Sequence, residues 1–288
     1  MENLGYYNGE TGKAMLEVEK LNKTYPYSGP NRGNPTGREV FSLKDISFTL
    51  PGGCILGFIG VNGAGKTTTL KSILNIAKPD SGTVRFLGQN FYEHEALLKQ
   101  KIGFMPGPAD YYQKTKAKKV ADVYRRFFTE WDGNVFNDYL CRFGIDAEKK
   151  IGELSAGSKV KFALALALSH NAKLLILDEP TGGLDPVARD ELLGLFREIA
   201  SSADRSILFS THITADLDKC ADRIIFIKNG ELIADDTREG LVEKHRRLTG
   251  TDAALEDIMI YHHREAAGTW NPNRDPQDRR TSGSRFPA

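Results

Sequence analysis

Short apolar runs alternate with longer amphipathic segments along most of this chain. The clearest apolar runs cover 54–60, 174–177 and 206–210, and apolar residues recur at helical spacing after each of them, from Lys66, from Pro186 and beyond the third run. Apolar runs of this length that alternate with helices are typical of buried strands in a mainly parallel sheet. The pattern therefore predicts an α/β fold in which helices pack on the faces of the sheet.

The middle of the chain breaks this rhythm. Between about 111 and 150, aromatic and aliphatic residues recur at helical spacing with no strand pattern between them, which predicts a helical subdomain. Further along, apolar residues at 224–227 and 231–234 flank the pair Asn229-Gly230, which suits a hairpin turn whose two central residues have positive φ. Helical patterns return at 241–245 and 253–260.

Polar stretches rich in glycine and proline set the outer limits of the fold. Residues 1–14 and 265–288 contain little to bury and are predicted to be flexible tails. Residues 28–37 are predicted to be a surface loop between two strand-like segments. The predicted organisation has one domain at 15–240, which includes the helical subdomain at about 108–158, followed by helices at 241–264 and the C-terminal tail at 265–288.

Composition narrows the class of protein. The 288 residues are 40% hydrophobic and 27% charged with a formal net charge of +1, which fits one α/β domain with a helical annex. That balance gives no overall attraction to nucleic acid, and no nucleic-acid partner is expected. The apolar runs are far shorter than the roughly 20 residues that cross a bilayer, and the N-terminus lacks the pattern of a signal peptide. The three cysteines are widely spaced and indicate neither a disulfide framework nor a zinc site, which fits a reducing cytosol.

The strongest chemical signal is the stretch from Gly60 to Thr68, which matches GxxxxGK followed by Thr and lies between a predicted strand and a predicted helix. Its glycines let the backbone approach phosphate, and successive amide groups and the helix N-terminus face the phosphates. Lys66 is expected to neutralise the β- and γ-phosphates, and the Thr67 hydroxyl to reach magnesium. The predicted nucleotide-binding residues of this loop are Asn62, Gly63, Ala64, Gly65, Lys66, Thr67 and Thr68. A glycine-rich turn is the plainer interpretation, which the flanking elements disfavour.

The apolar run at 174–177 ends in two carboxylates. Asp178 is the expected ligand of Mg²⁺, and Glu179 is expected to polarise the attacking water as a general base, a role that contributes ~10²- to 10⁴-fold in rate. Taken alone, a buried strand that ends in solvated acids is an equally good interpretation. The phosphate-binding loop upstream favours the catalytic one.

With these two motifs in place, residues from about 15 to 235 resemble the ATP-binding cassette (ABC) family. Residues 154–158, LSAGS, resemble the family's LSGGQ signature, residues 183–185 resemble its D-loop, and His212 its switch histidine. The resemblance implies a P-loop ABC ATPase core, in which an antiparallel β portion and a helical subdomain accompany the mainly parallel sheet. It also implies that Tyr25 stacks on adenine. Each minor motif has a plainer interpretation, such as an N-cap at Ser155, a surface histidine or a core tyrosine.

The resemblance further implies that two copies face each other head to tail. Ser155 and Gly157 of one copy would then contact the γ-phosphate of the ATP bound to the other. ATP would close the dimer, and hydrolysis through Glu179, His212 and Lys66 would open it. The pair can be a homodimer, or a heterodimer with a second ABC ATPase in which one shared site is degenerate.

Two positions depart from the family pattern. Gly107 follows the strand-like segment 101–105, where family members usually place a glutamine that contacts magnesium and senses the membrane partner, so altered coupling is expected. In the signature, Ala156 and Ser158 replace a glycine and a glutamine. Activity is expected to survive these two changes because Ser155 and Gly157 are retained.

A single ATPase domain without a membrane-spanning segment implies a separate membrane permease as partner. Residues 169–189 resemble the single-domain ATPases of bacterial drug and peptide exporters of the ABC-2 type, so the predicted function is to power export from the cytoplasmic face of the cell membrane. A helix of the permease is expected to dock near 109–124, which includes the basic run 114–119; a solvated charged face is the alternative. A soluble ABC ATPase that acts on ribosomes or DNA, or a P-loop kinase or GTPase, is the rival function.

Overall fold

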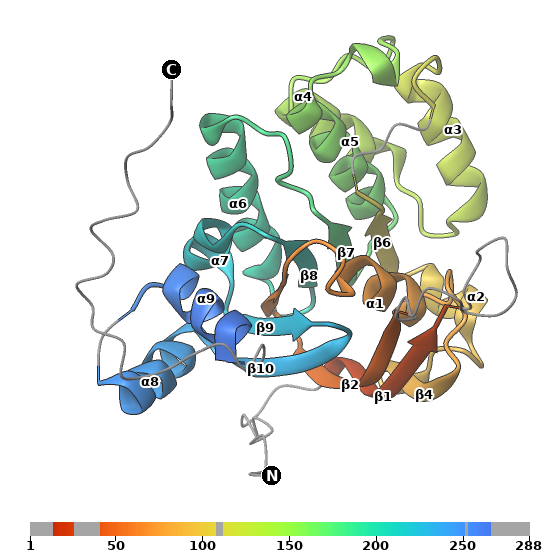
Figure 1. The fold of residues 1–288 in the computed structure, drawn as a ribbon. Coiled ribbons are helices and arrows are strands. Elements are labelled where there is room, and N and C mark those ends of the chain that lie inside the picture. The colour runs from red at the N-terminus through yellow and green to blue at the C-terminus, as the bar shows by residue number, and fades with distance from the viewer. Residues whose placement is uncertain (1–13, 26–40, 108–111, 251–252, 266–288) are drawn as a thin grey trace, which may run out of the picture.

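The computed structural model describes residues 14–25, 41–107, 112–250 and 253–265. The predicted loop at 28–37 and nearly all of both predicted tails lie outside the described residues. The described part contains a mainly parallel sheet and an antiparallel sheet, and helices cover the larger sheet (Figure 1). The α/β architecture expected from the sequence is confirmed.

The larger sheet has six strands in the order β10-β9-β3-β8-β7-β6. Neighbouring strands from β9 to β6 are parallel, and β10 runs antiparallel to β9. Strands β3, β7 and β8 are buried at every position because both faces of the sheet are covered, so they appear in the sequence as continuous apolar runs. The bounds are β3 (Ile55–Ile59), β6 (Ile102–Met105), β7 (Leu174–Asp178), β8 (Ser206–Thr211), β9 (Arg223–Lys228) and β10 (Glu231–Thr237).

The predicted hairpin is formed by β9 and β10. Asn229 and Gly230 have φ values of 48° and 78°, as the turn requires. A side chain at Gly230 would also collide with the carbonyl oxygen of Ser42. The Gly230 N–H donates a 2.9 Å hydrogen bond to the carbonyl oxygen of Ala64, so the hairpin turn supports the loop between β3 and the next helix.

The antiparallel sheet has the order β2-β1-β4-β5. Its bounds are β1 (Ala14–Thr24), β2 (Ser42–Pro51), β4 (Ser81–Phe86) and β5 (Gln89–Asn90). The register between β1 and β2 shifts along the pair, and buried and exposed positions alternate irregularly along both strands. The resemblance implied an antiparallel portion, and β1 and β2 occupy the two strand-like segments expected before and after residues 28–37.

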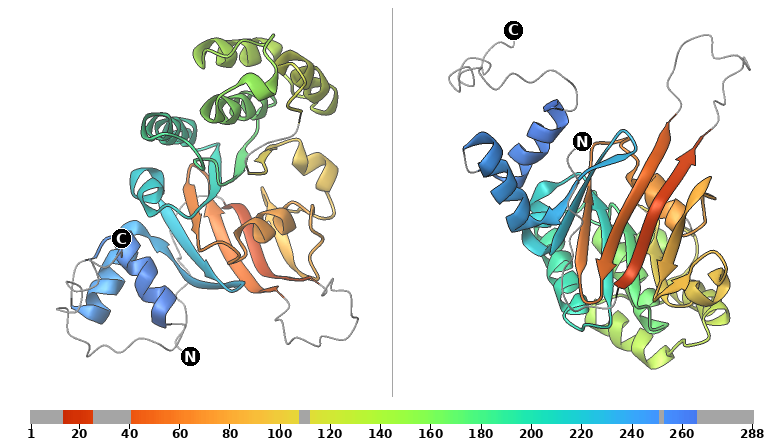
Figure 2. Two further views of the ribbon diagram at one scale, coloured as in Figure 1. Left: turned by 45° about the horizontal axis from the view of Figure 1, so that its top comes forward. Right: turned by 90° about the horizontal axis from the view of Figure 1, so that it is seen from below.

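Helix α1 (Lys66–Ile73) lies between the two sheets, where Leu70 and Ile73 join a core that includes residues of both. The opposite face of the larger sheet is covered mainly by α6 (Pro186–Ala200), α7 (Thr214–Cys220), α8 (Arg238–Thr249) and α9 (Leu255–Glu265) (Figure 2). The last two helices confirm the helical patterns near the C-terminus. This layering brings the carboxyl ends of β3, β7 and β8 to one edge.

The predicted helical part is also present, and it has a core of its own beside the larger sheet (Figure 2). Helix α2 (Glu95–Lys99) precedes β6, and the segment after β6 contains α3 (Ala117–Phe127), α4 (Gly133–Arg142), η1 (Ile151–Glu153) and α5 (Ala156–Ser169). Within the described ranges, no helix combines the length and apolarity that a bilayer crossing requires.

Candidate active site

The predicted phosphate-binding segment consists of the loop 60–65, which connects β3 to α1, and of Lys66, Thr67 and Thr68 in the first turn of that helix. Gly65 has φ 118°, a left-handed conformation that favours glycine. A side chain at Gly60 would collide with the carbonyl oxygen of Ile227 in β9, so the backbone needs glycine there as well. The loop therefore presents backbone amides and a helix N-terminus to the same space, which suits a phosphate chain.

Lys66 places its ammonium group inside this loop. Its Nζ donates a 2.7 Å hydrogen bond to the Gly60 carbonyl oxygen and lies 3.2 Å from Glu179 Oε1, with the side chain only 6% exposed. The positive charge is therefore held between the loop and the end of β7. An incoming phosphate can replace these acceptors, because an ammonium group has three rotatable donors.

Thr67, Asp178 and Ser210 form a hydrogen-bonded chain across three elements. The Thr67 hydroxyl donates to Asp178 Oδ2 at 2.7 Å, and the Ser210 hydroxyl donates to Asp178 Oδ1 at 2.6 Å. A hydroxyl and a carboxylate in contact offer the hard oxygen ligands that Mg²⁺ takes alongside phosphate oxygens and water. The donor set therefore fits a magnesium ion, and Ser210 fixes the carboxylate orientation.

Glu179 and His212 face each other where β7 and β8 end. His212 Nδ1 lies 2.7 Å from Glu179 Oε2, and the Glu179 backbone N–H donates to the Ser210 hydroxyl at 3.0 Å. Glu179 has φ 49°, which is unusual for a residue other than glycine. Backbone strain of this kind is concentrated at functional sites, and here it directs the carboxylate toward Lys66 and His212.

Lys66, Thr67, Glu179 and His212 line one open cleft of about 620 Å³. Tyr25 reaches it from the end of β1, and its side chain is half-exposed there. Sequence reasoning missed Phe41, whose carbonyl oxygen accepts a hydrogen bond from the Tyr25 N–H and whose ring joins the lining. The loop residues in the lining are Val61, Asn62, Gly63, Gly65, Lys66, Thr67 and Thr68, with Glu179, Gly182, Gly183 and His212 opposite them.

Four predicted site residues do not belong to this lining: Asp178, whose contacts with Thr67 and Ser210 are given above, and Ala64, Ser155 and Gly157. Ala64 is buried beneath the loop. Ser155 and Gly157 stand at the start of α5, and Ser155 caps that helix by accepting a hydrogen bond from the Ser158 N–H at 3.1 Å. The N-cap interpretation is therefore correct within one chain. It is compatible with a contact to a second chain, because Ser155 remains exposed.

Gly107 follows β6 and stands beside the site. A side-chain carbon built there would lie 4.0 Å from the Asp178 carbonyl oxygen. Its φ of 51° is left-handed, a conformation that costs other L-residues about 1–2 kcal/mol. A Cβ at this position would therefore not collide with the described residues, but the backbone conformation favours glycine.

Comparison with known proteins agrees with this geometry. The family model described as "ABC transporter" matches residues 43–182. ABC transporter ATP-binding protein YtrB of Bacillus subtilis (strain 168) is 37% identical over 218 residues, which cover 76% of this chain and 70% of that protein. Bacitracin transport ATP-binding protein BcrA of Bacillus licheniformis is 31% identical, over 72% of this chain and 68% of that protein.

The chain belongs to the family of ABC transporter ATP-binding proteins. A solved structure described as a dimeric post-hydrolysis state of the ATP-binding cassette MJ0796 bound to ADP and Pi shares the fold, with a TM-score of 0.65 and 22% identity. That similarity covers 77% of this chain and 98% of the other. The likeness to drug and peptide exporter ATPases that the sequence suggested is confirmed.

Proposed function

We propose that this chain binds and hydrolyses ATP to power export through a separate membrane permease. The observation that carries the proposal is the assembly of Lys66, Glu179 and His212 around one phosphate-binding loop. Membership of the ABC family supports ATP as the nucleotide. The name of BcrA, a bacitracin transport protein, favours export of a drug or peptide.

The proposed roles follow from the contacts. Lys66 and the amides of the loop bind the phosphates, and Tyr25 stacks on the base. Glu179 accepts a proton from the attacking water, and His212 orients the Glu179 carboxylate. Thr67 and Asp178 hold Mg²⁺, which when bound neutralises charge on the β- and γ-phosphates. Ser155 and Gly157 complete the site of a second cassette, either an identical chain or another ABC ATPase.

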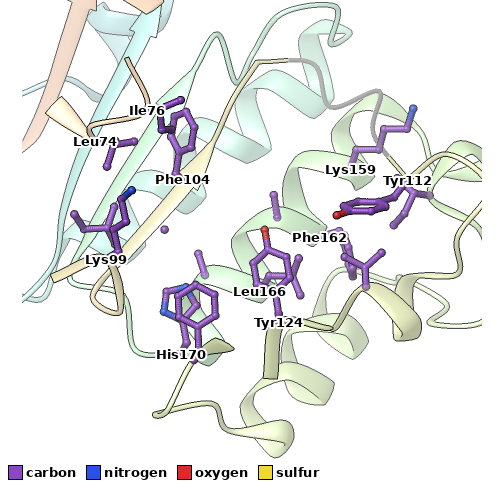
Figure 3. Close-up of a pocket in the computed structure, with 17 residues that line it drawn as sticks. Leu74, Ile76, Lys99, Phe104, Tyr112, Tyr124, Lys159, Phe162, Leu166 and His170 are labelled. Carbon is purple, nitrogen blue, oxygen red and sulfur yellow. The ribbon is translucent and has the colours of Figure 1, made fainter. Parts of the chain in front are cut away.

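An apolar groove supports docking of the permease. It has a volume of about 290 Å³ and separates the core from the helical part (Figure 3). Leu74, Ile76 and Phe104 form one wall, and Tyr124 and Phe162 belong to the other. Two lining residues, Phe104 and Tyr112, stand before and after Gly107 in the sequence, and we propose that an occupant of the groove would therefore influence the magnesium site. We propose that a cytoplasmic helix of the permease fills it and holds the chain at the inner face of the cell membrane.

The basic run at 114–119 has a more structural role than the sequence suggested. Lys116 and Lys118 both pair with Glu148, which follows α4. Their hydrogen bonds lower the pKa of Glu148 to about 2. The permease contact that we propose is therefore centred on the apolar groove. Residues 109–111, at the start of the predicted docking region, lie outside the described residues.

Co-purification tests the groove. Ile76 is 53% exposed and lines the groove, so Ile76→Glu should fold normally but bury a charge when the permease docks. We expect recovery of the co-purified membrane protein to fall at least about tenfold. Leu248→Glu is the matched control, because Leu248 on α8 is 66% exposed and lies outside the groove. Equal recovery with both variants would exclude this docking site.

A glutamine at Gly107 should restore a contact near magnesium. One added hydrogen bond contributes about 0.5–1.5 kcal/mol, so we expect the Mg²⁺ concentration for half-maximal ATPase activity to fall about two- to tenfold in Gly107→Gln relative to Gly107→Ala. The alanine variant has the same backbone strain without the amide. If the two variants have the same magnesium dependence and the same stimulation by the permease, Gly107 does not explain altered coupling.

A further inference from the structure

Asp216 is a buried carboxylate beneath the candidate active site that the proposed reaction does not use. It lies in the first turn of α7, four residues after His212, and is 1% exposed. A carboxylate is buried at this depth only when neighbouring groups compensate for the water that it loses. Its partners therefore indicate what it holds in place.

One oxygen of Asp216 joins the two segments that carry Glu179 and His212. Oδ2 accepts a 2.6 Å hydrogen bond from the Thr181 hydroxyl, and the Thr211 hydroxyl lies 3.5 Å from the same atom. Thr181 stands two residues after Glu179, and Thr211 immediately precedes His212. Both threonines are fully buried, so neither hydroxyl has water as an alternative partner.

The other oxygen of Asp216 faces a third element. Oδ1 lies 3.8 Å from Arg189 Nε, and among the described residues neither of these two buried atoms has a hydrogen-bond partner. Arg189 is in α6, which follows the Gly182-Gly183 segment that lines the cleft. The Asp216 carboxylate thus faces both segments that follow β7 and β8, as well as the helix that continues from the first of them.

We propose that Asp216 is a positioning residue for ATP hydrolysis, which sets the Glu179–His212 pair through Thr181 and Thr211. The inference rests on the proposed hydrolytic function. The 2.7 Å contact between Glu179 and His212 depends on how the ends of β7 and β8 are placed relative to each other. A misplacement of about 1 Å at reacting groups can cost about 10²-fold in rate. Phosphate binding depends on the loop after β3, which Asp216 does not contact.

The decisive comparison is between two substitutions at Thr181. Thr181→Val keeps the shape and removes the hydroxyl, and we expect kcat to fall about 10- to 100-fold with the Kd for ATP unchanged within about twofold. Thr181→Ser keeps the hydroxyl and should retain kcat within about threefold of wild type. A residue that only stabilised the fold would not separate kcat from ATP affinity in this way.

Asp216→Asn tests the carboxylate itself. The asparagine side-chain oxygen can still accept the hydrogen bond from the Thr181 hydroxyl. Its NH₂ group would face the Arg189 guanidinium, and both of these groups are donors, so kcat should again fall about 10- to 100-fold. Asp190→Asn is the matched control, because Asp190 pairs with Lys219 and also joins α6 to α7, but on the surface. The double variant Thr181→Val/Asp216→Asn should lose no more activity than Asp216→Asn alone, because residues that act as a unit are not additive.

ATP hydrolysis by the wild-type protein distinguishes a failure of the proposed function from a failure of the proposed role of Asp216. A wild-type protein that binds but does not hydrolyse ATP would contradict the proposed function itself. If wild type hydrolyses ATP and Thr181→Val has the same kcat, the proposed role of Asp216 is wrong, although the proposed function stands. The same holds if Thr181→Val loses kcat and ATP affinity in proportion. If Asp216→Asn no longer unfolds cooperatively on heating, the comparison of Thr181→Val with Thr181→Ser tests the proposed role of Asp216 instead.

Discussion

Glu179→Gln should lower kcat for ATP hydrolysis by about 10²- to 10⁴-fold while leaving ATP binding intact. The glutamine has the size of the glutamate and can still accept from His212, but it cannot take the proton of the attacking water. Lys66 remains 2.7 Å from the Gly60 carbonyl oxygen, so the phosphate-binding loop is preserved. Single-turnover hydrolysis and equilibrium ATP binding measure the two properties separately.

The same variant should accumulate as a dimer when ATP and Mg²⁺ are present, because the step that opens the dimer is blocked. Light scattering with and without nucleotide measures this directly. Glu191→Gln is the matched control, since Glu191 is an exposed glutamate that pairs with Lys161 away from the cleft. A monomer that binds ATP would mean that the partner is a different cassette or that the permease is needed. A monomer that binds no ATP would contradict the proposed nucleotide site.

Two variants that are each inactive should restore activity when they are mixed. Lys66→Ala removes the ammonium group from the phosphate-binding loop, and we expect at least about a 10²-fold loss of activity. Gly157→Asp should cost a similar amount by placing a carboxylate against the phosphate of the facing copy. We expect the fold to accept this change, because a Cβ at Gly157 would lie 3.5 Å from its nearest neighbour, the Ala188 Cβ, and because a carboxylate is favourable at the N-terminus of α5.

A mixed dimer has one site with both defects and one site with neither. With equal amounts of the two chains and independent sites, about one quarter of the wild-type rate should return. Gly157→Ala, which adds bulk without charge, serves as the control for the glycine position. Absence of recovery in a mixture that does form dimers would show that Ser155 and Gly157 do not complete the site of a partner chain.

The sequence was most informative where the function depends on a short continuous segment. The loop from Gly60 to Thr68 and the pair Asp178 and Glu179 could be predicted because each follows a buried strand, and parallel strands end at the same edge of a sheet. In the structure these two segments are in contact, through Thr67 with Asp178 and Lys66 with Glu179. Their roles in binding and hydrolysis remain proposals that the variants above test.

The remaining contacts join segments that are far apart in the chain. Phe41 beside Tyr25, Ser210 behind Asp178, and Lys116 with Glu148 have no local signature, because sequence spacing does not record which side chains meet across a fold. The antiparallel pairing of β1 with β2 and β4 likewise depends on how these strands meet in the assembled sheet.

By itself, then, the sequence determined the strand and helix rhythm, the phosphate-binding loop and the carboxylates at the end of β7, since local chain geometry produces all three. The tertiary structure alone decided the pairing of Glu179 with His212, the burial of Asp216 beneath them and the groove beside α3. Each of these depends on how the ends of separate elements pack, and packing is a property of the assembled core.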